Sequence, residues 1–267
     1  MHIVVCVKHI PDPEAPWAQF KLDEVARTVV PMTGVRWLMS PFDEQALEAA
    51  LRLRDAGAAA RITVLSLGPA AALAVLRHGL AMGADDGILL SDPALDGGDG
   101  FATATALAAA LRHIGRVDLV LTGRQGADLD AGVTGGSLAE LLEWPIVSFA
   151  AALALEAGEL RIERVVEEGR EECALLLPAV VTVSNELGAP RTPSLRETMK
   201  AARKPVLTWS AGELGLDAGS AGAPASRSRR ERLVAYTREG VCEMMAGGTP
   251  AERGAALARQ LIAAGLA

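Results

Sequence analysis

Aromatic residues and cysteines are scarce in this sequence, and each scarcity excludes a class of protein. Phe, Trp and Tyr make up only 3% of the chain, so aromatic platforms for stacking bases or sugars are not expected. The three cysteines, Cys6, Cys173 and Cys242, lie far apart, which argues against a disulfide framework and against a metal-ligand cluster. We therefore expect a cytoplasmic protein with an aliphatic core and no metal site.

The chain also lacks an excess of positive charge and long apolar segments. Its formal net charge of −7 disfavours a nucleic-acid partner, because such proteins need a basic face to displace counterions from phosphates. No apolar run is long enough to span a bilayer, and no basic leader precedes the first apolar residues. We expect a soluble, unprocessed protein that is not embedded in a membrane.

Two common nucleotide motifs are missing. No GxGxxG follows the first strand-like segment, and no GxxxxGK[ST] occurs. The sequence therefore disfavours an ordinary NAD-dependent dehydrogenase and a P-loop protein. The four histidines are scattered without ligand spacing, and no pair of nucleophile and base stands out. The sequence therefore predicts no catalytic residue.

The sequence does contain a regular alternation of strand-like and helical segments. Short β-branched runs lie at residues 2–7, 61–68, 87–92 and 118–123. Helical patterns lie between or after them at residues 42–57, 69–83, 101–115 and 134–144. Ser40 is a candidate cap for the first of these helices, and Pro41 suits its first position. The alternation predicts an α/β fold with a doubly wound, mostly parallel, Rossmann-like sheet.

The pattern changes after Pro145. Strand-like stretches separated by Gly-containing turns predict antiparallel hairpins that extend the sheet. Beyond residue 204 the chain is rich in Gly, Ala, Ser and Pro, and one last helix is predicted at 249–265, capped by Thr249 with Pro250 in first position. We expect an α/β nucleotide-binding domain at 1–204 and a linker with a C-terminal arm at 205–267.

A ligand of such a sheet would bind beyond the carboxyl ends of the strands, where helix starts present unpaired backbone donors. The Gly-rich segment GRQGADLDAGVTGG, residues 123–136, is the best candidate for enclosing a phosphate. A plain turn is an equally good interpretation of this segment alone. Asp128 and Asp130 are more simply polar turn residues than a catalytic pair.

Several segments together resemble the beta subunit of electron-transfer flavoproteins, including the members associated with nitrogen fixation. They are VCVKHIPDP, SPFDEQALEAALRLRDAG, GLAMGADDGILLSD, DLVLTGRQGADLDAGVTGGSLAELL and PRTPSLRETMKA, and their order and spacing cover most of the chain. The resemblance implies a heterodimer in which an alpha subunit carries FAD and this chain binds an adenine nucleotide, usually AMP, without performing bond chemistry itself. It also implies that Phe42 lies near the flavin ring.

The residues that the resemblance assigns to the cofactor site share one end of the predicted sheet. They are Cys6, Ser40, Pro41, Phe42, Leu67, Gly123, Arg124, Gln125, Gly126, Ala127, Asp128, Leu129, Asp130, Ala131, Gly132, Val133 and Thr134.

This sequence departs from the family in two places. Ser40 replaces a common asparagine, and the phosphate loop reads AGVTG instead of a more polar Asn-Gln-Thr-Gly. In the bifurcating branch of the family, the beta subunit holds a second FAD in place of AMP and takes part in NADH oxidation. Members of that branch typically have valine at the position of Thr134, so Thr134 favours AMP.

The segment PRTPSL resembles the recognition loop with which the beta subunit docks acyl-CoA dehydrogenases. Leu195 would be its exposed anchor, although a buried connector residue is the competing interpretation. The resemblance further implies that the arm beyond Pro205 wraps the alpha subunit, and that a quinone oxidoreductase or similar acceptor lies downstream. A stand-alone adenine-nucleotide-binding protein is the last alternative, but it gives the arm and PRTPSL no role.

Overall fold

The computed structural model describes residues 1–58, 60–217, 219–235, 240 and 242–266. The chain forms two compact units, Met1–Glu231 and Arg232–Ala267. The first unit contains the central sheet and the candidate site.

Within the described residues, the sheet of the first unit has nine strands in the order β11-β10-β9-β12-β8-β1-β6-β7-β13. Its parallel strands are β1 (His2–Cys6), β6 (Arg61–Leu67), β7 (Asp86–Leu90), β8 (Leu119–Gly123), β12 (Ala179–Val183) and β13 (Leu207–Trp209). The central strands are buried on both faces, which explains their unbroken runs of Val, Ile and Leu. The four strands predicted from the sequence are confirmed, with ends within two residues of the expected ones.

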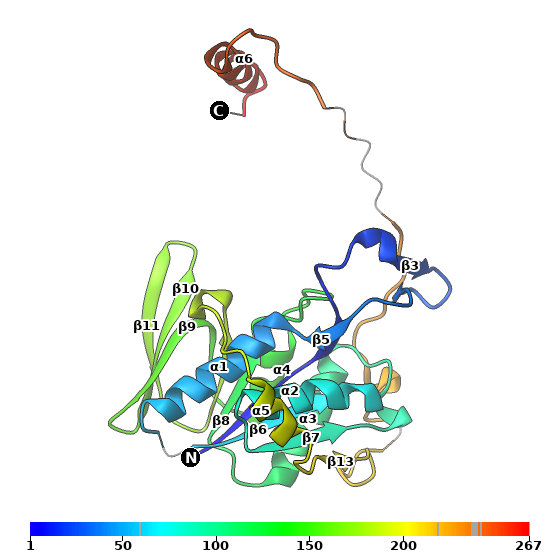
Figure 1. Ribbon diagram of the computed structural model, residues 1–267. Coiled ribbons are helices and arrows are strands. Elements are labelled where there is room, and N and C mark those ends of the chain that lie inside the picture. The colour runs from blue at the N-terminus through cyan, green and yellow to red at the C-terminus, as the bar shows by residue number, and fades with distance from the viewer. Residues whose placement is uncertain (59, 218, 236–239, 241, 267) are drawn as a thin grey trace. The chain divides into compact units, whose positions relative to one another are not determined.

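Helices cover both faces of this sheet (Figure 1). On one face, α1 (Pro41–Asp55) and α2 (Leu73–Met82) bury residues such as Leu47 and Leu76 in one core cluster. On the other face, α3 (Gly100–Ile114) and α4 (Thr134–Leu142) bury Leu107 and Leu138 in a second cluster. The doubly wound α/β architecture is therefore confirmed. The predicted second helix differs in its first turn, which is the 3-10 helix η2 (Ala70–Ala72).

Antiparallel strands extend one edge of the sheet, as predicted. They are β9 (Ile146–Glu156), β10 (Glu159–Val166) and β11 (Gly169–Leu175). The first part of β9 pairs in parallel with β12, while the rest of β9 pairs with β10. In Figure 1 these antiparallel strands reach beyond the helices. Residues 169–172 of the outer strand β11, which include Glu171 and Glu172, are exposed.

An excursion between β1 and α1 was not predicted, because its strands have only three or four residues. It contains β2 (His9–Pro11), the 3-10 helix η1 (Trp17–Gln19), β3 (Phe20–Asp23), β4 (Thr28–Pro31) and β5 (Trp37–Met39). β2 pairs with β5 and β3 pairs with β4, both antiparallel. The excursion returns the chain to Ser40, directly beside the end of β1, where the N–H of Ser40 donates to the Lys8 carbonyl at 3.0 Å.

The first unit continues past residue 204, the expected boundary, to Glu231. After η4 (Asn185–Leu187) and α5 (Leu195–Ala201), β13 adds an edge strand next to β7. The small side chains of the following segment are the reason, since Ala211 and Ala221 are buried against the second core cluster. Part of this Gly- and Ala-rich stretch, where the sequence predicted a linker, is therefore packed against the domain, and η5 (Ala223–Ala225) follows directly after the buried Gly222. The remaining 3-10 helix of this unit, η3 (Pro93–Leu95), follows β7.

The second unit contains α6 (Pro250–Ala263). Thr249 caps it through a capping box with Glu252, and Pro250 occupies its first position, as predicted. Across the described residues, none of the helices combines the length and the hydropathy needed to cross a bilayer.

Candidate functional site

The direction of winding of the sheet reverses between β1 and β8. From β1 the chain proceeds to β6 and β7 on one side, and it then returns to β8 on the other side of β1. Ligands of open α/β sheets bind beyond the carboxyl ends of the strands at such a reversal. The residues that follow β1 and β8 and the start of α1 meet at this point.

Asp43, in the first turn of α1, joins the ends of the two strands. Its carboxylate oxygens accept hydrogen bonds from the backbone N–H of Lys8, at 2.8 Å, and of Gly123, at 3.1 Å. The side chain is almost completely buried. Burial raises the pKa of Asp43 to about 7, although the hydrogen bonds from Lys8 and Gly123 act in the opposite direction. Sequence reasoning missed this role of Asp43.

Two glycines allow the close approach of elements at this edge. A Cβ on Gly123 would lie 2.6 Å from Asp43 Oδ1 and 2.7 Å from Phe42 Cβ, so no larger residue fits. A Cβ on Gly135 would lie 2.6 Å from Thr182 Cγ2, which places the start of α4 directly against β12. These contacts hold the two ends of the loop of residues 123–134 against the sheet.

Side-chain bonds fix the middle of this loop. Lys8 Nζ contacts both carboxylate oxygens of Asp128, at 2.8 and 2.7 Å, and Gln125 Nε2 donates to Asp130 Oδ1 at 2.8 Å. Asp130 has a φ of 50° and Gly132 a φ of 63°, so the chain turns sharply here. Both aspartates thus stabilise the turn, as expected of polar turn residues.

Ser40 connects the start of α1 to the same loop. It occupies the cap position, but its side chain makes no capping hydrogen bond, so that prediction was wrong. The Ser40 Oγ instead accepts a hydrogen bond from the N–H of Ala127, at 3.4 Å, because the loop lies over this buried hydroxyl. Pro41 is in the first helical position, as predicted.

The start of α4 presents backbone donors at the end of the loop. The helix begins at Thr134, and no side chain caps it. First-turn N–H groups have no partner within a helix and carry the positive end of its dipole. The start of α3 closes one side, since a Cβ on Gly100 would lie 2.4 Å from Val133 Cγ2. This arrangement suits a phosphate or another anion.

Cys6 and Leu67 end the neighbouring strands β1 and β6. Burial raises the pKa of the Cys6 thiol to about 12, and the charge of Asp43 adds to the rise, so the thiol stays protonated at neutral pH. Leu67 is half-buried and packs on the second core cluster. Both residues can contribute packing and backbone contacts. Among the described residues, no group of three or more His, Cys, Asp and Glu could hold a metal ion.

The side chain of Arg124 contacts its loop neighbour Gln125, whose Oε1 accepts from Arg124 Nε at 3.3 Å, and also residues outside the loop. The backbone N–H of Arg124 donates to the Val183 carbonyl at 2.9 Å, and the guanidinium carbon lies 5.4 Å from the ring centroid of Phe42 and 5.8 Å from that of Phe149. We call Phe42, Arg124 and Phe149 the Arg124 platform. Sequence reasoning missed Phe149, because its contact with Arg124 depends on a local irregularity of β9.

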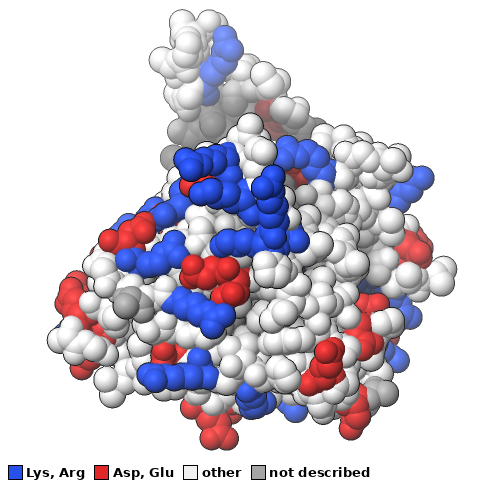
Figure 2. Space-filling model, turned by 60° about the horizontal axis from the view of Figure 1, so that its bottom comes forward, with Lys and Arg blue, Asp and Glu red and all other residues white. Residues whose placement is uncertain are grey.

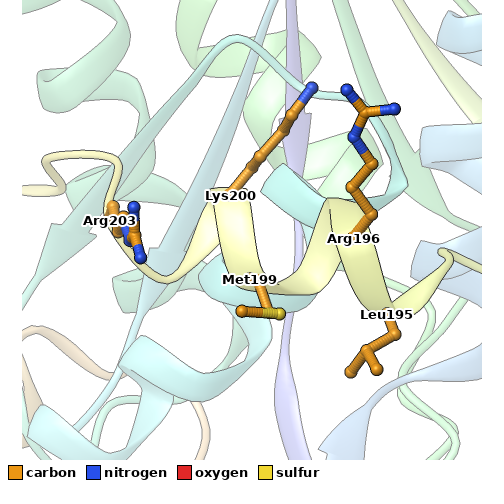
Figure 3. Close-up of a pocket in the computed structure, with 5 residues that line it drawn as sticks. All are labelled: Leu195, Arg196, Met199, Lys200 and Arg203. Atoms are coloured by element: carbon orange, nitrogen blue, oxygen red, sulfur yellow. The ribbon is translucent and has the colours of Figure 1, made fainter.

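Leu195 lies on a separate surface, which α5 forms with Leu195, Arg196, Met199, Lys200 and Arg203 (Figure 3). We call it the α5 surface. Leu195 is the first helical residue and not a loop residue, and a capping box fixes the helix start. Leu195 is 77% exposed and Met199 56% exposed. In Figure 3 both point to one side of the helix, while Arg196 and Lys200 point to the other.

Strong polar contacts hold α5 against the domain. Arg191, just before the helix, pairs with Glu48 at 2.7 Å and with Asp55 at 2.8 Å, both on α1. The side chain of Arg77 on α2 donates to the Ala201 carbonyl at 2.7 Å. The exposed apolar side chains are thus presented from a fixed helix.

Comparison with known proteins agrees with this architecture. A family model described as "Electron transfer flavoprotein domain" matches residues 28–214. Caffeyl-CoA reductase-Etf complex subunit CarD from Acetobacterium woodii is 35% identical over 261 residues, which is 98% of each chain. The electron transfer flavoprotein subunit beta of Megasphaera elsdenii is 38% identical over 239 residues, 87% of each chain. The chain belongs to the electron transfer flavoprotein beta-subunit family.

Members of this family include Protein FixA of Azorhizobium caulinodans, which is 37% identical over 224 residues, 81% of this chain and 78% of FixA. The family resemblance seen in the sequence is thereby confirmed. The similarity to CarD covers more residues than the first compact unit contains, so it continues into the second unit.

Proposed function

We propose that this chain is the beta subunit of a heterodimeric electron transfer flavoprotein, and that it binds one AMP in the loop of residues 123–134. An alpha subunit carries the FAD, which accepts and donates the electrons. The chain itself performs no bond chemistry. The observation that carries this proposal is the uncapped start of α4 at the end of a Gly-containing loop that Asp43 and Lys8 hold in place.

The residues at this edge fit an adenylate. The first-turn amides of α4 supply donors and positive potential for the phosphate. Ser66 Oγ, near the carboxyl end of β6, is buried and has no hydrogen-bond partner among the described residues, which suits a site that a polar ligand completes. Thr134 favours AMP over a second FAD, because the family's FAD-binding branch typically has valine there.

We also propose that the second unit binds the alpha subunit. Its helix α6 is well capped, yet Leu257, Ile262 and the nearby Leu266 remain 45%, 64% and 74% exposed. A helix with an exposed apolar side gains stability by packing on a partner. The proposed domain organisation is therefore a nucleotide-binding unit followed by an arm for the alpha subunit.

The α5 surface is the proposed docking site for electron-donating flavoenzymes of the acyl-CoA dehydrogenase type. An exposed leucine on a rigid helix is a suitable anchor for an apolar pocket. Although the chain is acidic overall, the α5 surface carries the cations Arg196, Lys200 and Arg203. Figure 2 shows that Lys and Arg are gathered on part of one face of the molecule, with Asp and Glu mainly around its rim. The name of CarD connects that relative with a caffeyl-CoA reductase. A quinone oxidoreductase or a similar protein is the proposed downstream acceptor.

The test is to co-express the chain with its alpha subunit, to release the bound nucleotides with acid and to separate them by chromatography. We expect one FAD and one AMP per heterodimer. Two FAD molecules and no AMP per heterodimer would contradict this function. That result would support the alternative of a bifurcating subunit that takes part in NADH oxidation. A chain that remains monomeric beside the alpha subunit and binds ATP would support the stand-alone nucleotide-binding alternative.

A further inference from the structure

Phe149 adopts an unusual backbone conformation at the edge of the candidate site. Its φ is 64°, a left-handed value that is rare for a bulky residue. The register between β12 and β9 shifts at this point, and the Phe149 N–H donates to Thr182 Oγ1 at 3.1 Å. Such bulges occur next to functional sites, where they redirect a side chain.

The bulge brings the Phe149 ring to the guanidinium of Arg124. The ring of Phe42, from the start of α1, contacts the same guanidinium, and Asn185 Oδ1 accepts from it at 3.2 Å. Three elements that are distant in the sequence therefore hold one positively charged group. Despite these contacts, Phe149 remains 44% exposed, so the platform is not simply part of the core.

The positive charge of Arg124 is not neutralised by an ion pair in the described part of the chain. Glu186 is an acidic group that senses this charge. The pKa of Glu186 is lowered, chiefly by the hydroxyl of Ser184 and by a backbone hydrogen bond, with a smaller contribution from Arg124. The Glu186 carboxylate is thus already bound to Ser184, and Arg124 can act on a ligand.

We propose that the Arg124 platform receives the flavin ring of the FAD carried by the alpha subunit, and that Arg124 stabilises the negative charge which this ring gains on reduction. This inference rests on the proposed function. Two electrons and one proton added to the oxidised ring leave it with one negative charge. A fixed guanidinium beside it favours this state, and the two Phe rings offer apolar contact and exclude water.

Reductive titration of the purified heterodimer tests the proposal. Dithionite supplies the electrons, and a redox dye reports the potential. For Arg124→Gln we expect about a tenfold smaller equilibrium constant for two-electron reduction, which is a shift of about 30 mV toward negative potential. Phe149→Leu should shift the potential in the same direction by less. Arg124→Lys, which keeps the charge, should recover most of the shift.

Arg116→Gln is the matched control, because Arg116 is a highly exposed arginine near the amino end of β8 and should leave the potential unchanged. FAD and AMP contents are measured on every variant. Unchanged potentials in Arg124→Gln and Phe149→Leu heterodimers with full FAD would overturn the platform while leaving the proposed function intact. A wild-type heterodimer without AMP would instead contradict the proposed function. If Arg124→Gln does not assemble, Phe149→Leu and Arg124→Lys decide the question.

Discussion

The loop of residues 123–134 and the α5 surface differ in how they present their functional groups. The loop offers backbone N–H groups and is held by a buried carboxylate, an ion pair and close-packed glycines. The α5 surface offers side chains, with two exposed apolar residues among three cations on a capped helix. The comparison teaches that a backbone site depends on its conformation, whereas a side-chain site depends on residue identity.

The largest expected effect concerns Asp43, which has no counterpart on the α5 surface. Because burial raises its pKa to about 7, the folded chain keeps a proton that the unfolded chain loses near pH 4. The resulting stability is complete below that pH and is lost as the pH rises toward 7. The loss is up to about 1.4 kcal/mol per pH unit. Unfolding by urea between pH 5 and 8 should show this slope in the wild type and a reduced slope in Asp43→Asn.

The control for Asp43 is Glu197→Gln in the capping box of α5. The pKa of Glu197 is lowered, mainly by hydrogen bonds from Ser194, so its contribution is lost only in acid. The slope between pH 5 and 8 should stay unchanged. Equal slopes in wild type and Asp43→Asn would show that the buried carboxylate does not titrate in this range.

Gly123→Ala should be the most damaging substitution in the loop itself. The added Cβ would overlap Asp43 and the backbone of Phe42, and we expect a loss of about 1–3 kcal/mol in the free energy of unfolding together with loss of the nucleotide. Thermal unfolding and nucleotide content measure both effects. Gly212→Ala, which adds a Cβ in open space without a positive φ, should change neither. A Gly123→Ala protein that keeps its full nucleotide content would contradict the proposal that the loop binds the nucleotide through its backbone.

Leu195→Ala should leave the fold intact and weaken docking. Loss of an anchor side chain commonly costs about 2 kcal/mol of binding, which corresponds to roughly thirtyfold. Dehydrogenase-dependent reduction of the flavin, measured by stopped flow at low partner concentration, should slow accordingly, with AMP content and heterodimer assembly unchanged. Leu207→Ala, at an exposed position on β13, is the control. Identical kinetics for both variants would remove the docking role of Leu195.

Lys8→Met should have the smallest effect. The ion pair with Asp128 is partly exposed, with 46% of the Lys8 side chain accessible, so it contributes less than about 1 kcal/mol. We expect AMP to bind up to about fivefold more weakly at low salt, with a smaller difference at high salt. Titration calorimetry on nucleotide-free heterodimer measures this, and Lys21→Met on β3 is the control. A difference that does not respond to salt would argue for a packing role of Lys8.

Much of the fold could be predicted because its signals are local. Buried β-branched runs and the Pro41 and Thr249 helix starts depend on neighbouring residues, and their predictions were confirmed. The position of the candidate loop also followed from the sheet, since loops after parallel strands share one edge.

The remaining features depend on contacts between distant segments. Asp43 accepts hydrogen bonds from Lys8 and Gly123, and Phe149 contacts Arg124 because of a bulge. The strand β13 pairs with β7, although the two strands are far apart in the sequence. No pattern of hydrophobic spacing reports such contacts. The prediction that the Ser40 side chain caps α1 was wrong for the same reason, because the Ser40 hydroxyl accepts from the N–H of Ala127 in the distant loop.

A crystal structure of the heterodimer with bound nucleotide tests the central claim most directly. We predict an adenylate phosphate within hydrogen-bond distance of the backbone N–H groups at the start of α4, with the loop of residues 123–134 around it. An adenylate bound elsewhere on the chain, or a flavin filling this loop, would contradict the account.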